Sequence, residues 1–153
     1  MTFVPDPPHV LTSNAGWRLQ GNENTLQKCL SVVRDLKLRS SLFVDPFEIS
    51  IDELKTFKEM GCDRIELYTE KFSDDFASDQ EEATTARYAQ CAQIASELGL
   101  GLNAGHDLNL KNLRALKLAI PKLDEVSIGH ALICDALYFG LEKTVQKYLD
   151  LLK

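Results

Sequence analysis

The fold is decided by residues 41–69, which read SLFVDPFEISIDELKTFKEMGCDRIELYT. The apolar run Ser41–Val44 is stopped by an Asp-Pro pair, which predicts a short buried strand. Ser50 and Glu53 have the spacing of a capping box, so a helix is expected to begin there and to end at the next glycine. A second strand is expected over Arg64–Thr69. Two strands joined by a helix form a right-handed crossover, which makes them parallel.

The same alternation continues on both sides of this unit, with apolar residues at helical spacing in the expected helices. Proline, glycine or acidic residues cluster where the alternation is interrupted. The elements expected are an irregular segment 1–22, a helix 24–38, an acidic loop 70–79, a helix 80–98, a strand 100–104, a helix 110–120 capped by Asn109, a strand 125–128, and helices over 131–152 broken near Gly140. Along the helix 80–98, one face is expected to carry Ala83, Arg87, Cys91, Ile94 and Leu98.

Four strands, each followed by a helix, predict an α/β fold with a parallel sheet in a single domain over residues 1–153. Two architectures compete, an open doubly wound sheet and part of a (β/α)8 barrel of the TIM type. No GxGxxG or Walker A motif is present, which removes the commonest nucleotide-binding reason for the open sheet. A complete barrel needs about 250 residues. The pattern therefore favours about half of a barrel.

Composition excludes several classes of partner. The formal net charge of −6 argues against nucleic acid or an anionic membrane surface as a partner. No apolar run reaches the roughly 18 residues that span a bilayer, and the N-terminus lacks the features of a signal peptide, so a cytoplasmic location is expected. The four cysteines have no CxxC or CxxH pair, which indicates reduced, mostly buried thiols and no metal site.

A charged residue interrupts the apolar strand 64–69. Glu66 lies between two apolar neighbours, so its carboxylate points to the opposite face, together with Arg64 and Tyr68. Inside a barrel such a carboxylate is unfavourable unless it is paired or hydrogen-bonded. Two interpretations stay open: a structural ion pair with Arg64 or another interior cation, or a carboxylate aimed at a reacting group.

Two further clusters follow the ends of strands, where (β/α)8 barrels have their active sites. In Asn103-Ala-Gly-His106-Asp107, the histidine is either a general acid or base or a solvated loop residue, and Gly105 before it would let a ligand approach the backbone. In Ser127-Ile-Gly129-His130-Ala131, a glycine turn at a helix N-terminus either binds phosphate or is an ordinary tight turn. Near the N-terminus, Thr12 either contacts a phosphate or completes a turn.

In this order and at these intervals, the clusters resemble the pyridoxine 5′-phosphate synthase family. The matching stretches are Phe3-Val-Pro, Leu11-Thr12, Ser41-Leu-Phe-Val-Asp45, Ile65-Glu-Leu-Tyr-Thr69, Leu102-Asn-Ala-Gly-His106 and Ile128-Gly-His-Ala131. The resemblance implies a (β/α)8 barrel that condenses 1-deoxy-D-xylulose 5-phosphate with 3-amino-2-oxopropyl phosphate to form pyridoxine 5′-phosphate. It also implies no metal or organic cofactor, small phosphate substrates, and homo-oligomers, typically octamers.

The resemblance implies a role for each matching site residue. His106 corresponds to the proton donor and Glu66 to the carboxylate that stabilises the transition state. Gly129 and His130 correspond to the pair that binds the phosphate of the amino-ketone, and Thr12 to a contact with the deoxyxylulose phosphate. Asp107 stands where the family often has a glycine that contacts the amino-ketone phosphate, so this carboxylate would have to turn away from the phosphate.

The family's N-terminal features have no counterpart in this chain. They are an Asn-x-Asp-His motif, the histidine that acts as general base, an arginine-rich phosphate loop and a second basic glutamate. The chain is therefore expected to be the C-terminal half of a barrel, with two unpaired sheet edges and an exposed apolar interior. The alternative function is a non-catalytic phosphate-binding half-barrel. A third reading, an aldolase or isomerase, predicts a lysine or paired acids at strand ends, and no predicted strand ends in lysine.

Overall fold

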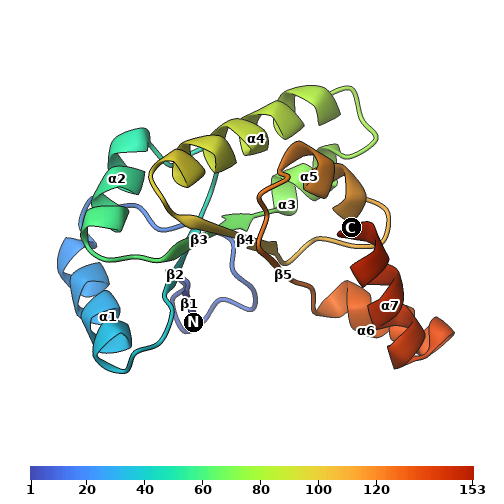
Figure 1. The fold of residues 1–153 in the computed structure, drawn as a ribbon, viewed down its shortest axis with the longest axis horizontal. Helices are drawn as coiled ribbons and strands as arrows, with labels where there is room; N and C mark the ends of the chain where they lie inside the picture. Colours follow the sequence, from blue (N-terminus) through green and yellow to red (C-terminus); the bar gives the residue numbers. More distant parts are fainter.

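A computed structural model describes residues 1–153 of the chain. Strands and helices alternate along most of it (Figure 1). In chain order the elements are β1 (Thr2–Phe3), α1 (Glu23–Asp35), β2 (Ser41–Val44), α2 (Ile51–Glu59), β3 (Arg64–Tyr68), α3 (Glu70–Asp75), α4 (Glu81–Glu97), β4 (Gly101–Gly105), α5 (Leu113–Ala119), β5 (Glu125–Ser127), α6 (His130–Phe139) and α7 (Leu141–Leu151).

The five strands form one parallel sheet in the order β1-β2-β3-β4-β5. In Figure 1, α1, α2, α4 and α5 follow one another in an arc around these strands. Sequential order, parallel strands and helices outside the sheet are the features of the (β/α)8 barrel. The prediction of about half a barrel is confirmed.

The outer face of the sheet is apolar because alternate strand residues meet the helices. Leu42, Ile65 and Leu102 are in register across three strands, and all three are buried. They belong to a core cluster of 25 residues that extends from Trp17 to Tyr148. Each strand therefore contributes one face to the core beneath the helices.

The inner face of the sheet is polar, which corrects the expectation of an exposed apolar interior. Phe43, Glu66 and Asn103 are in register there, and Phe43, the apolar member of this row, is buried. Arg64 lies on the same face and donates to Asn103 Oδ1 over 2.9 Å. The strands alternate in polarity, so the side that would line a barrel is the hydrophilic one.

Local signals in the sequence account for the ends of α2 and α4. The hydroxyl of Ser50 accepts from the backbone N–H of Glu53 over 3.2 Å, and the Glu53 carboxylate accepts from the N–H of Ser50 over 3.0 Å. Gly61 and Gly99 follow the two helices with φ of +90° and +75°, a conformation that glycine adopts without strain. The predicted capping box is confirmed.

Other local predictions were wrong. Residues 2–3 of the supposedly irregular segment form β1, and residues 70–75 of the predicted loop form α3. The helix predicted from Asn109 begins at Leu113, because Asn109 turns its side chain to the N–H of Lys111 instead. On α4 the buried residues are Thr84, Tyr88, Cys91, Ala92 and Ala95, so of the predicted face only Cys91 is buried.

The last two helices pack on each other at the end of the sheet (Figure 1). Helix α6 buries none of its residues, although its sequence is largely apolar. None of the helices is long and apolar enough to cross a membrane. Of the four cysteines, Cys62 and Cys91 are buried and Cys134 is exposed, so the expectation of mostly buried thiols holds for only some of them.

Candidate functional site

A cavity of about 620 Å³ opens at the carboxyl ends of β3, β4 and β5. It is lined by all six residues singled out in the sequence, which come from four separate segments of the chain. The lining residues are Thr12, Glu66, Ser73, His106, Asp107, Ser127, Gly129, His130 and Ala131. Only chain folding brings these segments together, since residues 12 and 130 are far apart in sequence.

The backbone holds His106 in an unusual conformation at the end of β4. Its φ is +81°, a backbone angle that residues other than glycine rarely adopt. Its N–H donates to Ser127 O over 3.1 Å. A Cβ at Gly105 would lie 2.5 Å from that same carbonyl oxygen. Gly105 is therefore required by the close approach of β5, where the sequence had indicated room for a ligand.

The imidazole of His106 faces the loop that follows β1. Its Nε2 lies 2.8 Å from the hydroxyl oxygen of Thr12. The rings of Phe43 and Tyr68 lie edge-on to it, with centroids 6.5 and 6.4 Å away. The side chain is 35% exposed, so the ring has apolar support on one side and open space on the other. This placement suits a group that exchanges a proton with a bound molecule.

Asp107 directs its carboxylate toward the other nitrogen of the same ring. Its Oδ2 lies 3.4 Å from His106 Nδ1. The backbone of Asp107 is held as well, since its N–H donates to the hydroxyl of Thr69 over 3.3 Å. The His106 ring thus lies between a hydroxyl at Nε2 and a carboxylate near Nδ1.

Glu66 does not form an ion pair with Arg64. The guanidinium instead lies 3.6 Å from Asp124 and 3.6 Å from Glu125. The carboxylate of Glu66 accepts a hydrogen bond from the hydroxyl of Thr2 over 2.7 Å. The interior carboxylate is therefore left without a cationic partner at the wall of the cavity.

Gly129 and His130 form the start of α6. Gly129 is the N-cap residue, has no side chain to cap the helix, and has open space where a Cβ would stand. The first backbone N–H groups of a helix have no partner within the helix, and the helix dipole favours negative charge beside them. The cavity therefore ends at a place suited to an anion such as phosphate.

The family model described as "Pyridoxal phosphate biosynthesis protein PdxJ" matches residues 1–153. The chain belongs to the PdxJ family. It is 50% identical over 153 residues to the pyridoxine 5′-phosphate synthase of Christiangramia forsetii and 49% identical over 153 residues to that of Cytophaga hutchinsonii. Both matches cover 100% of this chain and 63% of the relative. The synthase of Porphyromonas gingivalis is 47% identical over 150 residues, which are 98% of this chain and 61% of that protein.

Sequence reasoning missed three residues that line the cavity of this PdxJ chain. Ser73 belongs to α3, which was predicted as a loop, so no signal placed it near the site. Ser127 and Ala131 stood in the quoted glycine-turn cluster but were not proposed as site residues. The alternation of β5 could have found Ser127, because it shares the inner face with Glu125.

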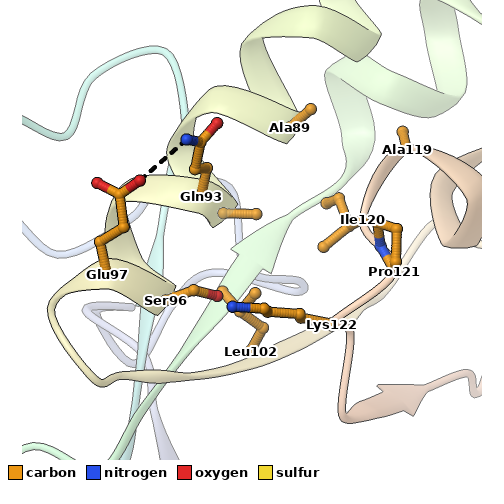
Figure 2. A pocket seen from close by; sticks show the side chains of 10 residues that line it. Ala89, Gln93, Ser96, Glu97, Leu102, Ala119, Ile120, Pro121 and Lys122 are labelled. Carbon is orange, nitrogen blue, oxygen red and sulfur yellow. Dashed lines mark hydrogen bonds between the residues drawn. The ribbon is translucent and has the colours of Figure 1, made fainter.

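A second hollow of about 400 Å³ lies on the outer side of this PdxJ chain, between α4 and α5. Figure 2 shows its walls, with Gln93 and Glu97 on α4 and Ile120 and Pro121 opposite. Gln93 donates to the carboxylate of Glu97 over 2.9 Å, so these polar groups satisfy each other. None of the residues singled out in the sequence lies there.

Proposed function

We propose that this chain carries the proton donor and the amino-ketone phosphate site of a pyridoxine 5′-phosphate synthase. The reaction condenses 1-deoxy-D-xylulose 5-phosphate with 3-amino-2-oxopropyl phosphate, and ring closure releases phosphate and water. The observation that carries the proposal is the meeting of Thr12, Glu66, His106 and the Gly129–His130 turn around one cavity. The relatives that are about half identical to this chain are pyridoxine 5′-phosphate synthases, which supports the same reaction.

In the proposed mechanism, His106 donates a proton through Nε2, the nitrogen that faces the cavity and the Thr12 hydroxyl. A bound substrate would take the place of that hydroxyl or share it. Glu66 would stabilise positive charge that develops on the amino-ketone, because its carboxylate has no cationic partner. The start of α6 would bind the phosphate through backbone N–H groups. These roles use no metal or organic cofactor, and that absence stays a prediction.

Asp107 belongs to the proposed substrate-binding set because it lines the same cavity. A carboxylate next to a phosphate is repelled by it. The position of Oδ2, 3.4 Å from His106 Nδ1, directs the charge toward the imidazole. Asp107 would then contact an uncharged part of the substrate, or act through the orientation of His106.

Ring formation from the two substrates tests the proposal. The general-base histidine of the family has no counterpart here, so the assay supplies the N-terminal segment of the Christiangramia forsetii synthase as a separate polypeptide. We expect turnover in the mixture, and His106→Ala should lower kcat much more than it raises KM. His9→Ala is the control, because His9 does not line the cavity. A variant His106→Ala with unchanged kcat would remove His106 from the chemistry.

The second candidate function is phosphate binding without turnover. It is favoured by the composition of the cavity, which offers His106 and His130 but no counterpart of the family's base. This candidate predicts saturable binding of 3-amino-2-oxopropyl phosphate and no product in any mixture. The turnover assay above separates the two candidates.

We also propose that the chain assembles into homo-oligomers, as the family resemblance implies. The exposed apolar residues of α6 support this, since Ile133, Leu137 and Tyr138 are 58%, 82% and 85% exposed. Sedimentation velocity should show a species larger than the monomer that is lost in Leu137→Glu. Leu118→Glu, on the exposed side of α5, is the matched control and should leave the assembly intact. A monomeric wild-type chain would contradict this proposal. A cytoplasmic location stays a prediction.

A further inference from the structure

Thr69 occupies a position where its side chain would normally cap a helix. It is the N-cap residue of α3, and threonine at an N-cap usually accepts a hydrogen bond from a backbone N–H of the first helical turn. Here the side chain makes no such bond. It is completely buried, so a buried hydroxyl at this place requires another partner.

The partners of that hydroxyl lie across the sheet, in the turn after β4. The Thr69 hydroxyl donates to the carbonyl oxygen of Gly105 and accepts from the N–H of Asp107 over 3.3 Å. These two groups belong to the residues on either side of His106. One hydroxyl thus binds an acceptor and a donor that flank the candidate proton donor. The N–H of Asp107 is shared, because it also donates to the carbonyl oxygen of Gly105 over 3.2 Å.

The conformation of His106 requires this kind of support. A φ of +81° is unfavourable for a residue with a Cβ and persists only where the surroundings hold it. The N–H of His106 donates to Ser127 O on β5, while Thr69, which directly follows β3, binds the groups on either side of His106. The segment that carries Thr69 is itself anchored, because the carbonyl of Tyr68 accepts from the buried hydroxyl of Tyr88 over 2.5 Å.

We propose that Thr69 is a positioning residue that holds the His106 turn in its strained conformation and so directs Nε2 toward the cavity. The inference deepens the proposed function, since it assigns a determinant of the proton donor's orientation. Thr69 does not touch the substrate in this proposal. Its effect passes through the backbone of Gly105 and Asp107.

The test compares variants of the chain by NMR, at a temperature where each is folded. Thr69→Val keeps the shape of the side chain and removes the hydroxyl, whereas Thr69→Ser keeps the hydroxyl. Thr144→Val is the matched control, because the Thr144 hydroxyl is also fully buried but has no hydrogen-bond partner. The readouts are the exchange rate of the Asp107 amide and the ¹⁵N shifts of the His106 ring, which report the hydrogen bond at Nε2.

For Thr69→Val we expect the Asp107 amide to exchange about threefold faster, because it loses one of its two acceptors and keeps the Gly105 carbonyl. The Nε2 signal should move to that of an imidazole without a hydrogen bond at this nitrogen. Thr69→Ser and Thr144→Val should keep both wild-type signals. A purely structural role would lower the melting temperature without moving the Nε2 signal of the folded molecule. Unchanged signals in Thr69→Val, or the same change in Thr144→Val, would overturn the proposal.

If Thr69→Val does not fold, the comparison of Thr69→Ala with Thr69→Ser decides the matter. Both remove the methyl group, but only serine keeps the hydroxyl, so equal signals in the two would overturn the proposal. Neither readout needs a substrate. An inactive chain with the expected NMR changes would contradict the proposed function alone, whereas an active chain without them would contradict only the role of Thr69.

Discussion

The closest backbone approach in the candidate site is at Gly105. Any Cβ there would lie 2.5 Å from Ser127 O and 3.1 Å from Ser127 Cβ. The same carbonyl accepts the N–H of His106, so the spacing between β4 and β5 also sets the position of the histidine. Packing and site geometry therefore depend on the same few atoms.

Replacing Gly105 by alanine should disturb both the packing of β4 against β5 and the position of His106. We expect Gly105→Ala to lower the free energy of unfolding by about 1–3 kcal/mol, because the strands must separate to admit the methyl group. Urea unfolding measures the loss. Gly129→Ala is the control, because nothing lies within 4 Å of the added methyl group. Equal stability of Gly105→Ala and the wild type would show that β5 does not approach as closely as described.

Glu53 makes the free energy of unfolding depend on pH in the acidic range. Burial disfavours its charged form, but hydrogen bonds from Arg18, the N–H of Leu19 and Ser50 outweigh this and lower the pKa from 4.5 to about 2. A pKa lowered by folding adds stability above pH 4.5, and this is lost as pH falls toward 2. Glu53→Gln should therefore be about 1–2 kcal/mol less stable than wild type at pH 7.

That difference should shrink as the pH falls from 4.5 toward 2, because the wild-type carboxyl becomes protonated. Urea unfolding of both proteins across this range measures it. A gap that stays constant with pH would show that the charge of Glu53 does not contribute.

Individual site residues could be predicted from the sequence where the residue type departed from the apolar pattern around it. His106 and Glu66 stood out because they interrupt or directly follow apolar strands. Thr69 did not, because its importance comes from Gly105 and Asp107, more than thirty residues away. Such contacts depend on strand register, which no local pattern in the sequence contains.

Among the helices, α2 shows how far local signals determine an element. Its capping box satisfies the first turn from within the segment, and the Glu53 of that box also binds Arg18 and Leu19 of the preceding loop. By contrast, α4 begins at Glu81, and the side chain of its N-cap residue Gln80 makes no capping bond. Its length and packing hold it instead.

This contrast gives a prediction for the two helix starts. Ser50→Ala should lower the free energy of unfolding by about 1 kcal/mol, because the N–H of Glu53 loses its acceptor. Gln80→Ala should change it by less than about 0.5 kcal/mol, as at an ordinary surface site. Urea denaturation of the two variants checks both values. Equal losses would mean that the capping box does not stabilise α2.

Element predictions failed where tertiary contacts overrode local preference. The acidic segment 70–75 forms α3 because Phe72 is buried in the core, although its charges indicated a loop. The buried face of α4 differs from the predicted one because Thr84 and Tyr88 bind partners inside the molecule: Asp75 and the carbonyl of Tyr68. Polar atoms on a buried face mislead a pattern that counts only apolar residues.

At the scale of the whole molecule, one core joins the N-terminal loop to the last helix. The cluster of 25 buried residues includes Trp17, the strands and Tyr148. We predict a single cooperative unfolding transition, as expected for one domain. In calorimetry the van't Hoff and calorimetric enthalpies should agree, whereas two separate transitions would contradict the single domain.

The half-barrel architecture was predictable because each strand and crossover helix had its own signal. The polar inner face was not, although the alternation of Arg64, Glu66 and Tyr68 hinted at it. Parallel strands are usually covered by helices on both faces and are apolar on both, which led to the expectation of an apolar interior. The outer face of this sheet follows the rule, whereas its inner face carries polar side chains.

Segments from four parts of the chain are proposed to form one phosphate-handling site. The most direct measurement is a titration of the ¹⁵N-labelled chain with inorganic phosphate, followed by NMR, in wild type and Gly129→Ala. We predict saturable shifts at the amides of Gly129 and His130 and at the ring of His106, and weaker binding in Gly129→Ala, whose methyl group stands at the helix start. Shifts confined to the α4–α5 hollow, or none at all, would show that these segments do not form a phosphate site.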